Sequence, residues 1–184
     1  MKKTLLFLLL LCFSGIAFCQ KYKIDEDTKL ITYSEVIEVP NVSKDELYLR
    51  ANTWLSRAFK SAKAVIDVQD KEAGKIIAKG NVMTIIKVPL VGKQEAGAVE
   101  MTITIQTKDG KYKYTVDNLQ HSKPFNTPGN WASIGPLEQE KAKAGMMVRP
   151  SNSEWKDLKE DAFKSIESMV EDLKKAMNKA EKDF

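Results

Sequence analysis

The chain has 184 residues, and its 29 lysines and arginines against 25 aspartates and glutamates give a formal net charge of +4. The two signs are interspersed, which argues against the one-signed field of a nucleic-acid-binding protein. There is one histidine, and the two cysteines, Cys12 and Cys19, both lie in the first segment of the chain. The rest of the sequence therefore lacks a thiol nucleophile and the usual ligands of zinc or copper, so we predict no metal, cofactor or internal disulfide.

The N-terminal segment, MKKTLLFLLLLCFSGIAFCQ, has the pattern of a secretory signal peptide. Two lysines precede an apolar run over residues 5–13, and a small-x-small cleavage site ends at Cys19. We predict that residues 1–19 are removed and that the exported chain, periplasmic or extracellular, has no transmembrane segment. Lipid attachment at Cys19 is the less favoured alternative, because the bulky Phe18 stands where lipoprotein signals carry a small residue.

After an N-terminal tail at residues 20–30, alternating apolar and polar residues predict a strand over residues 31–39, which Pro40 ends. Ser43 and Glu46 have the spacing of a capping box, which satisfies N–H groups that the first turn of a helix leaves unpaired. An amphipathic helix follows. Its apolar stripe consists of Leu47, Ala51, Trp54, Leu55, Ala58, Phe59 and Ala62.

Beyond this helix the apolar period changes to two, which indicates strands. The four predicted strands cover residues 64–69, 75–88, 98–107 and 111–116. Gly80, in the middle of the second of these, suggests a bulge or a bend. Asp109 and Gly110 are a hairpin signal between the last two. Together the four strands form an antiparallel meander.

Residues 119–152 are predicted to form an irregular loop, longer than compact domains ordinarily contain. Within it, a short helix is expected from Pro136 to Gly145, because proline suits a first turn and glycine a stop. A final amphipathic helix begins near Ser151 or Ser153 and is long enough to cross a whole sheet. Its apolar stripe consists of Trp155, Leu158, Ala162, Ile166, Met169, Val170, Leu173 and Met177. We predict one domain over residues 31–184.

This order of elements predicts an α+β fold in which both helices cover one face of an antiparallel sheet. Three stretches of the sequence are distinctive: YLRANTWLSRAF, VIDVQDKEAGKIIAKGN and IQTKDGKYKYTVDNL. They resemble small secreted bacterial proteins that hold a domain of unknown function with a TATA-binding-protein-like (TBP-like) fold. The resemblance covers roughly residues 31–119 and implies the order β-α-β-β-β-β-α, but no catalytic residues. Binding of nucleic acid is not expected, because the chain has one such unit and a mixed charge.

The other face of the sheet is expected to carry polar side chains, including Thr102 and Thr104. By the alternation of side chains along the strand, Met83 and Ile85 are expected to point to this open face, unless a bulge at Gly80 shifts the register. Apolar side chains beside the threonines would indicate a partner, a ligand or a covering segment. The loop offers Phe125 and Trp131, which no helix or strand accounts for, and we hypothesise that they pack over part of this face.

For the single residues that could be catalytic or bind a metal, a structural role is the favoured interpretation. His121 lacks a recognisable nucleophile pattern, so a structural or solvent-exposed histidine is favoured over a general base. The acidic groups at residues 25–27 and at Asp67 and Asp70 lack the spacing of a calcium loop and are read as solvated turns. Trp54 and Trp155 are expected in the core.

These observations predict a non-catalytic exported binding module. Its partner would be an envelope protein, a glycan or a small ligand, held by the open face and the loop. The predicted contact residues are His121, Phe125, Trp131, Met83, Ile85, Thr102 and Thr104. One alternative is a hydrolase that uses carboxylates such as Glu100 and Asp117, since paired carboxylates need neither histidine nor cysteine. Another is a structural domain that self-associates as a homodimer.

Overall fold

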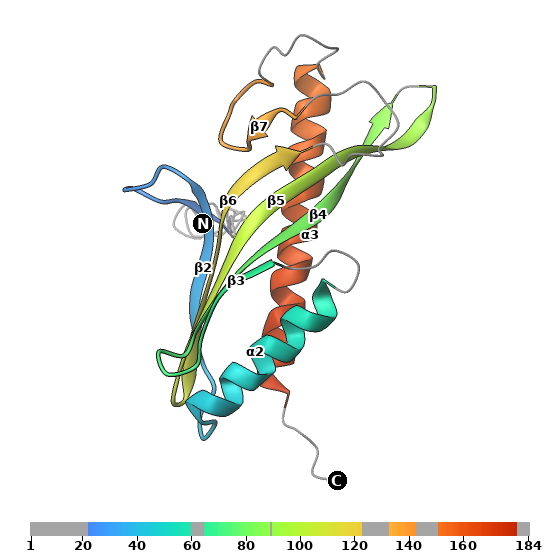
Figure 1. Cartoon of the computed structure of the whole chain (residues 1–184). Helices are drawn as coiled ribbons and strands as arrows, with labels where there is room; N and C mark the ends of the chain where they lie inside the picture. The colour runs from blue at the N-terminus through green and yellow to red at the C-terminus, as the bar shows by residue number, and fades with distance from the viewer. Residues whose placement is uncertain (1–21, 60–64, 89, 123–132, 143–150, 180–184) are drawn as a thin grey trace, which may run out of the picture.

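The computed structural model describes residues 22–59, 65–88, 90–122, 133–142 and 151–179, which form an antiparallel sheet and two helices (Figure 1). The strand order is β1-β2-β6-β5-β4-β3, and β7 pairs with β6. The strands are β1 (Lys23–Ile24), β2 (Ile31–Glu38), β3 (Val65–Asp70), β4 (Lys75–Val88), β5 (Gly92–Lys108), β6 (Lys111–Ser122) and β7 (Gly135–Pro136). The helices are α2 (Lys44–Ala58) and α3 (Asn152–Asn178). The predicted α+β class and antiparallel sheet are confirmed.

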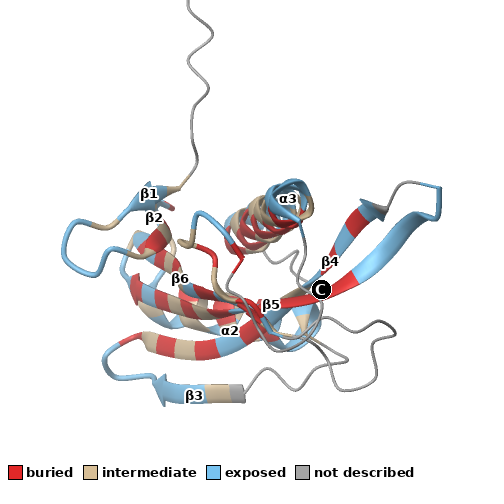
Figure 2. Ribbon diagram, turned by 90° about the horizontal axis from the view of Figure 1, so that it is seen from above, coloured by how far each residue is buried: buried red, intermediate tan, exposed pale blue. Residues whose placement is uncertain are grey.

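Both helices cover the same face of the sheet. Helix α3 packs along β4, and α2 packs on β5 and against α3. Figure 2 shows buried positions of α3 turned toward buried positions of the strands. Trp54 and Trp155 are buried in this layer, as predicted, and their indole N–H groups donate to Asp172 and to the Gln139 carbonyl. Neither helix has the length and apolar character that a membrane span requires within the described residues.

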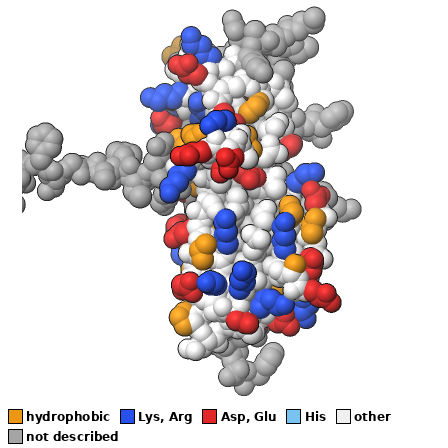
Figure 3. Space-filling view, turned by 90° about the vertical axis from the view of Figure 1, so that its left-hand side faces the viewer, with side chains coloured by type: hydrophobic (Ala, Val, Ile, Leu, Met, Phe, Trp, Pro, Cys, Tyr) orange, Lys and Arg blue, Asp and Glu red, His pale blue; other side chains and the backbone are white. Residues whose placement is uncertain are grey.

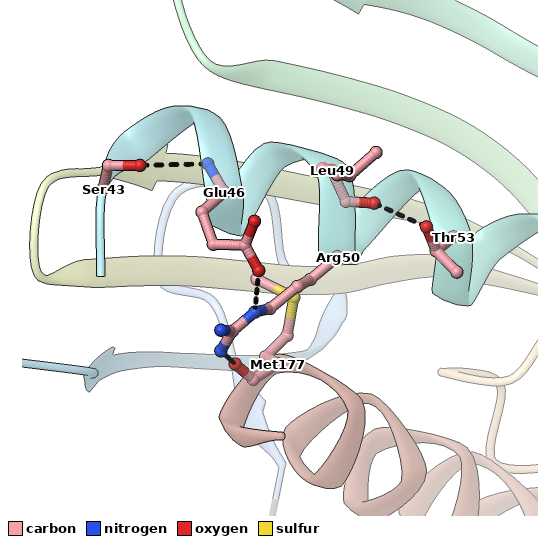
Figure 4. Close-up of polar contacts among 6 residues, drawn as sticks. All are labelled: Ser43, Glu46, Leu49, Arg50, Thr53 and Met177. Atoms are coloured by element: carbon pink, nitrogen blue, oxygen red, sulfur yellow. Dashed lines mark hydrogen bonds and ion pairs between the residues drawn. The ribbon is translucent and has the colours of Figure 1, made fainter. Parts of the chain in front are cut away.

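Polar contacts fix the start of α2 and its position on α3 (Figure 4). The Ser43 hydroxyl accepts from the Glu46 N–H at 3.2 Å, which is the first half of the expected capping box. The Glu46 carboxylate instead binds Arg50 Nε at 2.6 Å, and Arg50 Nη1 donates to the Met177 carbonyl at 2.8 Å. A guanidinium at this carbonyl is favourable because helix C-termini carry partial negative charge. The complete capping box forms at α3, between Ser151 and Glu154.

Two β-bulges change which side chains face the helices. On β5, Ala96 and Gly97 together lie opposite Thr84 of β4. On β6, Asn118 and Leu119 together lie opposite Met101 of β5. Gly97 has φ +96° and Asn118 has φ +53°, and glycine and asparagine are the residues that tolerate this left-handed conformation best. Each bulge shifts the strand by one residue, so the parity of the buried side chains changes beyond it.

Gly80 does not form the bulge that the sequence suggested. The pairing of β4 with β5 runs without interruption from Lys79 opposite Thr102 to Asn81 opposite Glu100. A Cβ atom at Gly80 would lie 2.6 Å from two carbons of the Phe59 ring. Gly80 is therefore required for close packing of the end of α2 on the sheet, and the backbone there stays regular.

Two connecting segments also differ from expectation. The predicted tail at residues 20–30 contains β1, which pairs with β2 through a turn in which the Asp25 side chain accepts from the N–H groups of Asp27 and Thr28. The predicted loop begins later, because β6 continues to Ser122. The short helix expected from Pro136 is not formed over residues 136–142, where β7 pairs with β6 and a turn follows. Burial of Leu137, whose N–H donates to the Leu119 carbonyl, outweighs the local helix signal.

The substitution Gly80→Ala tests the contact with Phe59. In a regular strand, replacing glycine by alanine removes backbone freedom from the unfolded chain and stabilises by about 0.4–1 kcal/mol. Here the Phe59 ring occupies the space of the new methyl group, so we expect a loss of about 1–3 kcal/mol in the free energy of unfolding. The measurement is chemical denaturation of Gly80→Ala, of Phe59→Ala and of the double variant. Strictly additive costs would show that the two residues are not in contact.

Candidate functional site

The open face of the sheet, which the helices leave uncovered, is mostly polar. Figure 3 shows basic and acidic side chains interspersed with uncharged groups on this side of the molecule, and hydrophobic side chains scattered between them. Thr102 and Thr104 of β5 and Lys79 of β4 lie on this face, as do Lys113 and Thr115 of β6. The open face is therefore suited to polar contacts.

A hollow of about 310 Å³ lies on the open face where β6 bulges. We call it the open-face hollow, and its lining residues are Lys79, Gly80, Asn81, Glu100, Met101, Thr102, Asn118 and Gln120. The bulge helps to form the hollow, because it carries Asn118 in the left-handed conformation at the wall. The Gln120 amide donates to Asn118 Oδ1 at 3.0 Å, and Lys79 Nζ lies 3.1 Å from the Asp67 carboxylate. The polar walls are thus partly pre-positioned before any ligand arrives.

The chemistry of the hollow is that of amide and hydroxyl groups, which both donate and accept hydrogen bonds. Glu100 is the only carboxylate among its lining residues. Asp117 lies opposite Thr102 but outside this lining. Burial, and then the charge of Asp25, raise the pKa of Asp117 above its usual value. Of the two carboxylates that the hydrolase alternative names, this hollow therefore holds Glu100 in its lining and not Asp117.

The predicted contact residues do not all lie at the open-face hollow. Thr102 lines the open-face hollow, and Thr104 is the next residue of β5 on the same face. Met83 and Ile85 also lie on this face, where their side chains are 44% and 43% exposed. They lie farther along β4, however, opposite Ala98 and Glu95. Ile85 is six residues beyond Lys79, which is roughly 20 Å in a strand, so it is not beside the threonines.

His121 lies on the opposite side of the sheet from the hollow and is 2% exposed. Its Nδ1 accepts from the Ile134 N–H at 3.2 Å, and its Nε2 lies 2.6 Å from the Ala96 carbonyl oxygen. Because Nδ1 accepts, Nε2 carries the proton and donates. The ring also packs edge-on against Trp155. His121 thus fastens the segment before β7 to β5 and α3, which is a structural role.

Phe125 and Trp131 lie outside the described residues, so their hypothesised place over the open face stays a hypothesis. The described end of the same loop, residues 133–142, packs on the helix side. Ile134 and Leu137 are buried there, and Glu138 accepts from the N–H of Ile31. This end of the loop thus contacts the backbone of β2 through Glu138 and buries Ile134 and Leu137 on the helix side.

The hollow contains residues that the sequence interpretation missed, chiefly Asn81, Asn118 and Gln120. A signal was present in β6, where Tyr112, Tyr114 and Val116 alternate and the next apolar residue, Leu119, comes after a step of three. Such a step indicates a change of parity, and an asparagine within it suits a bulge.

Three of the acidic groups considered for calcium, Asp25, Asp67 and Asp70, are engaged in turns or an ion pair. Asp25 Oδ1 accepts from the Thr28 hydroxyl at 2.9 Å, and Asp70 accepts from the Ala73 N–H at 2.8 Å. Among the described residues, no group of three or more histidine, cysteine or acidic side chains lies close enough to hold a metal ion.

The single histidine predicts a distinct pH dependence of stability. Burial lowers the pKa of His121 below its usual 6.5, and the bond to Ala96 only partly opposes this shift. The stability that neutral His121 provides is therefore present above the unfolded-state pKa and is lost as the pH falls through the lower folded-state pKa. His121→Gln, which retains a donor and an acceptor, should cost about 1–3 kcal/mol at pH 8 and show a smaller loss upon acidification. Denaturant titrations across this range measure both, and parallel pH profiles of the two proteins would contradict the assignment.

Comparisons with known proteins agree with this fold. Residues 33–122 match the model of a family described as a domain of unknown function (DUF4468) with TBP-like fold. A crystal structure of a DUF4468 family protein from Bacteroides ovatus superposes with a TM-score of 0.64 at 14% identity, covering 88% of this chain and 94% of that one. A TBP-like protein from Parabacteroides distasonis gives 0.63 at 15% identity, covering 86% and 99%. At such identities the likeness shows the fold alone. No curated protein matches the sequence.

Proposed function

Residues 33–122 belong to the DUF4468 family, whose description gives a TBP-like fold and no activity, so we propose a function from the site itself. The chain is an exported, non-catalytic binding module that takes a neutral glycan in the open-face hollow. Export follows from the signal-peptide pattern of the first residues, which would place the protein where envelope or external glycans are present.

The composition of the hollow is the observation that supports a glycan. Asn81, Asn118, Gln120 and Thr102 present amide and hydroxyl groups that match the donors and acceptors of sugar hydroxyls. Lys79 is paired with Asp67, which leaves Glu100 as the unpaired charge of the lining. A strongly anionic ligand would meet the Glu100 carboxylate, and a neutral polyhydroxylated ligand would not.

The self-associating alternative has less support on this face. A stable dimer interface buries roughly 800 Å² on each partner around an apolar centre. The exposed apolar side chains of this face are spread out. Val36 on β2 and Val68 on β3 lie toward opposite edges of the sheet. Met83 and Ile85 are neighbours on β4, but β5 and β6 separate them from Val36, so the exposed apolar side chains of the described open face do not form one large patch.

The test is a screen of the exported chain on a glycan array, followed by calorimetric titration of the best ligand. We expect Gln120→Ala and Asn81→Ala each to weaken binding by roughly fivefold to tenfold, the effect of one lost hydrogen bond. Gln106→Ala is the matched control, because Gln106 lies on the same face of β5 outside the hollow.

Equal weakening by Gln106→Ala and Gln120→Ala would place the binding surface elsewhere. A folded protein that binds no member of the array would leave the glycan proposal without support. Melting temperatures of all three variants distinguish lost contacts from lost structure.

A further inference from the structure

The hairpin that joins β4 to β5 extends beyond the rest of the fold. Figures 1 and 2 show it projecting past α3, and the outer part is exposed. We define the hairpin tip by Lys87, Leu90, Val91 and Lys93. These residues lie at the far end of the sheet from the β5–β6 hairpin.

Two aliphatic side chains of the tip are exposed to solvent. Leu90 has a relative exposure of 109% and Val91 of 62%. Leu90 also adopts φ +67°, a left-handed conformation that is unfavourable for a bulky side chain. Leucine at this position thus has two costs, backbone strain and exposure of apolar surface, that glycine or asparagine would avoid. Strain of this kind is concentrated at sites that contact something else.

The two lysines of the tip face each other without a counter-charge. Lys87 pairs directly with Lys93 across the strands. Neither has an acidic partner among the described residues, and like charges in such a pair repel. Lys108 and Lys111 form a similar pair at the opposite hairpin, but there Lys111 has Glu38 at 3.9 Å. The tip is therefore a cationic end that an external anion would stabilise.

We propose that the hairpin tip docks on an anionic lipid surface, with Lys87 and Lys93 at the phosphate groups and Leu90 and Val91 inserted at the level of the headgroups. Apolar side chains flanked by lysines are the combination that interfacial membrane binding uses. The shape supports a lipid surface over a protein partner. Two aliphatic side chains on a projecting turn are too small for a specific protein interface, whereas a bilayer accepts a narrow insertion.

The neighbouring residues extend this surface. Met83 and Ile85 are exposed behind the tip on the same strand, where they would approach the bilayer if the hairpin tilted. Glu95, opposite Ile85, is an acid on the same hairpin and is farther from the turn than both lysines. The inference does not depend on the glycan proposal, because no residue of the tip lines the open-face hollow.

The experiment is co-sedimentation of the chain from Gln20 to Phe184 with vesicles. This form contains every described element and omits the apolar segment that would itself bind lipid. The vesicles are phosphatidylcholine alone and phosphatidylcholine mixed with phosphatidylglycerol. We expect binding to the mixed vesicles only, and weaker binding as salt screens the charges.

Three variants separate the contributions of the tip. Lys87→Glu with Lys93→Glu should lower the partition coefficient by roughly thirtyfold or more, the effect of two lysines near an anionic surface. Leu90→Asn with Val91→Ser removes the apolar side chains and suits the left-handed backbone, so it should also weaken binding while the fold is kept. Lys108→Glu with Lys113→Glu makes the same change of net charge at the other end of the sheet and should bind as wild type does.

The proposal is overturned if the wild-type chain ignores anionic vesicles, or if the control reversal weakens binding as much as the tip reversal. It is also overturned if sedimentation velocity shows a dimer that the tip variants abolish, since the tip would then contact a second copy. Circular dichroism of each variant verifies folding before the vesicle assay.

Discussion

Strands β5 and β6 are 17 and 12 residues long, and in a regular strand one parity of side chains faces the same layer from end to end. The bulges at Gly97 and Asn118 interrupt this regularity. On β6, Tyr112, Tyr114 and Val116 face the helices before the bulge, and Leu119 and His121 face them after it. Without the shift, Leu119 and His121 would point to the open face, and Asn118 and Gln120 would point into the core. The rest of the molecule depends on this change of parity.

Several features follow from the bulges. On the helix side, His121 reaches the Ala96 carbonyl beside the β5 bulge and holds Ile134, so the chain can return along β6 as β7. On the open side, the bulge of β6 places Asn118 and Gln120 in the wall of the hollow. The bulge of β6 thus determines both the packing of His121 on the helix side and the position of the candidate site on the open side. Under both proposals, β4 carries the hollow at Asn81 and the lipid-facing tip at Lys87, about 20 Å apart along the strand.

Much of the fold was accessible from periodicity. The stripes containing Trp54 and Trp155 correctly gave two core helices, and alternation placed Met83 and Ile85 on the open face. The bulge of β5 was not found, because Gly80 and Gly97 carry the same local signal. Which glycine bends the strand is decided by the Phe59 ring packing on Gly80, a contact between distant residues. The prediction of a helix at Pro136 was wrong for a similar reason, because burial of Leu137 against β6 outweighed the local capping signals. The hollow depends on the bulge, so it could not be predicted until the bulge was known.

The change of parity at Asn118 is tested most directly by the surroundings of the imidazole in solution. In a nuclear Overhauser spectrum of the folded chain, the account predicts cross-peaks from the His121 ring to the Trp155 indole, with a slowly exchanging proton on Nε2. Cross-peaks from the ring to Thr102 or Asn81, or a rapidly exchanging imidazole without contact to Trp155, would contradict it. That result would place His121 on the open face and remove the structural basis of the hollow.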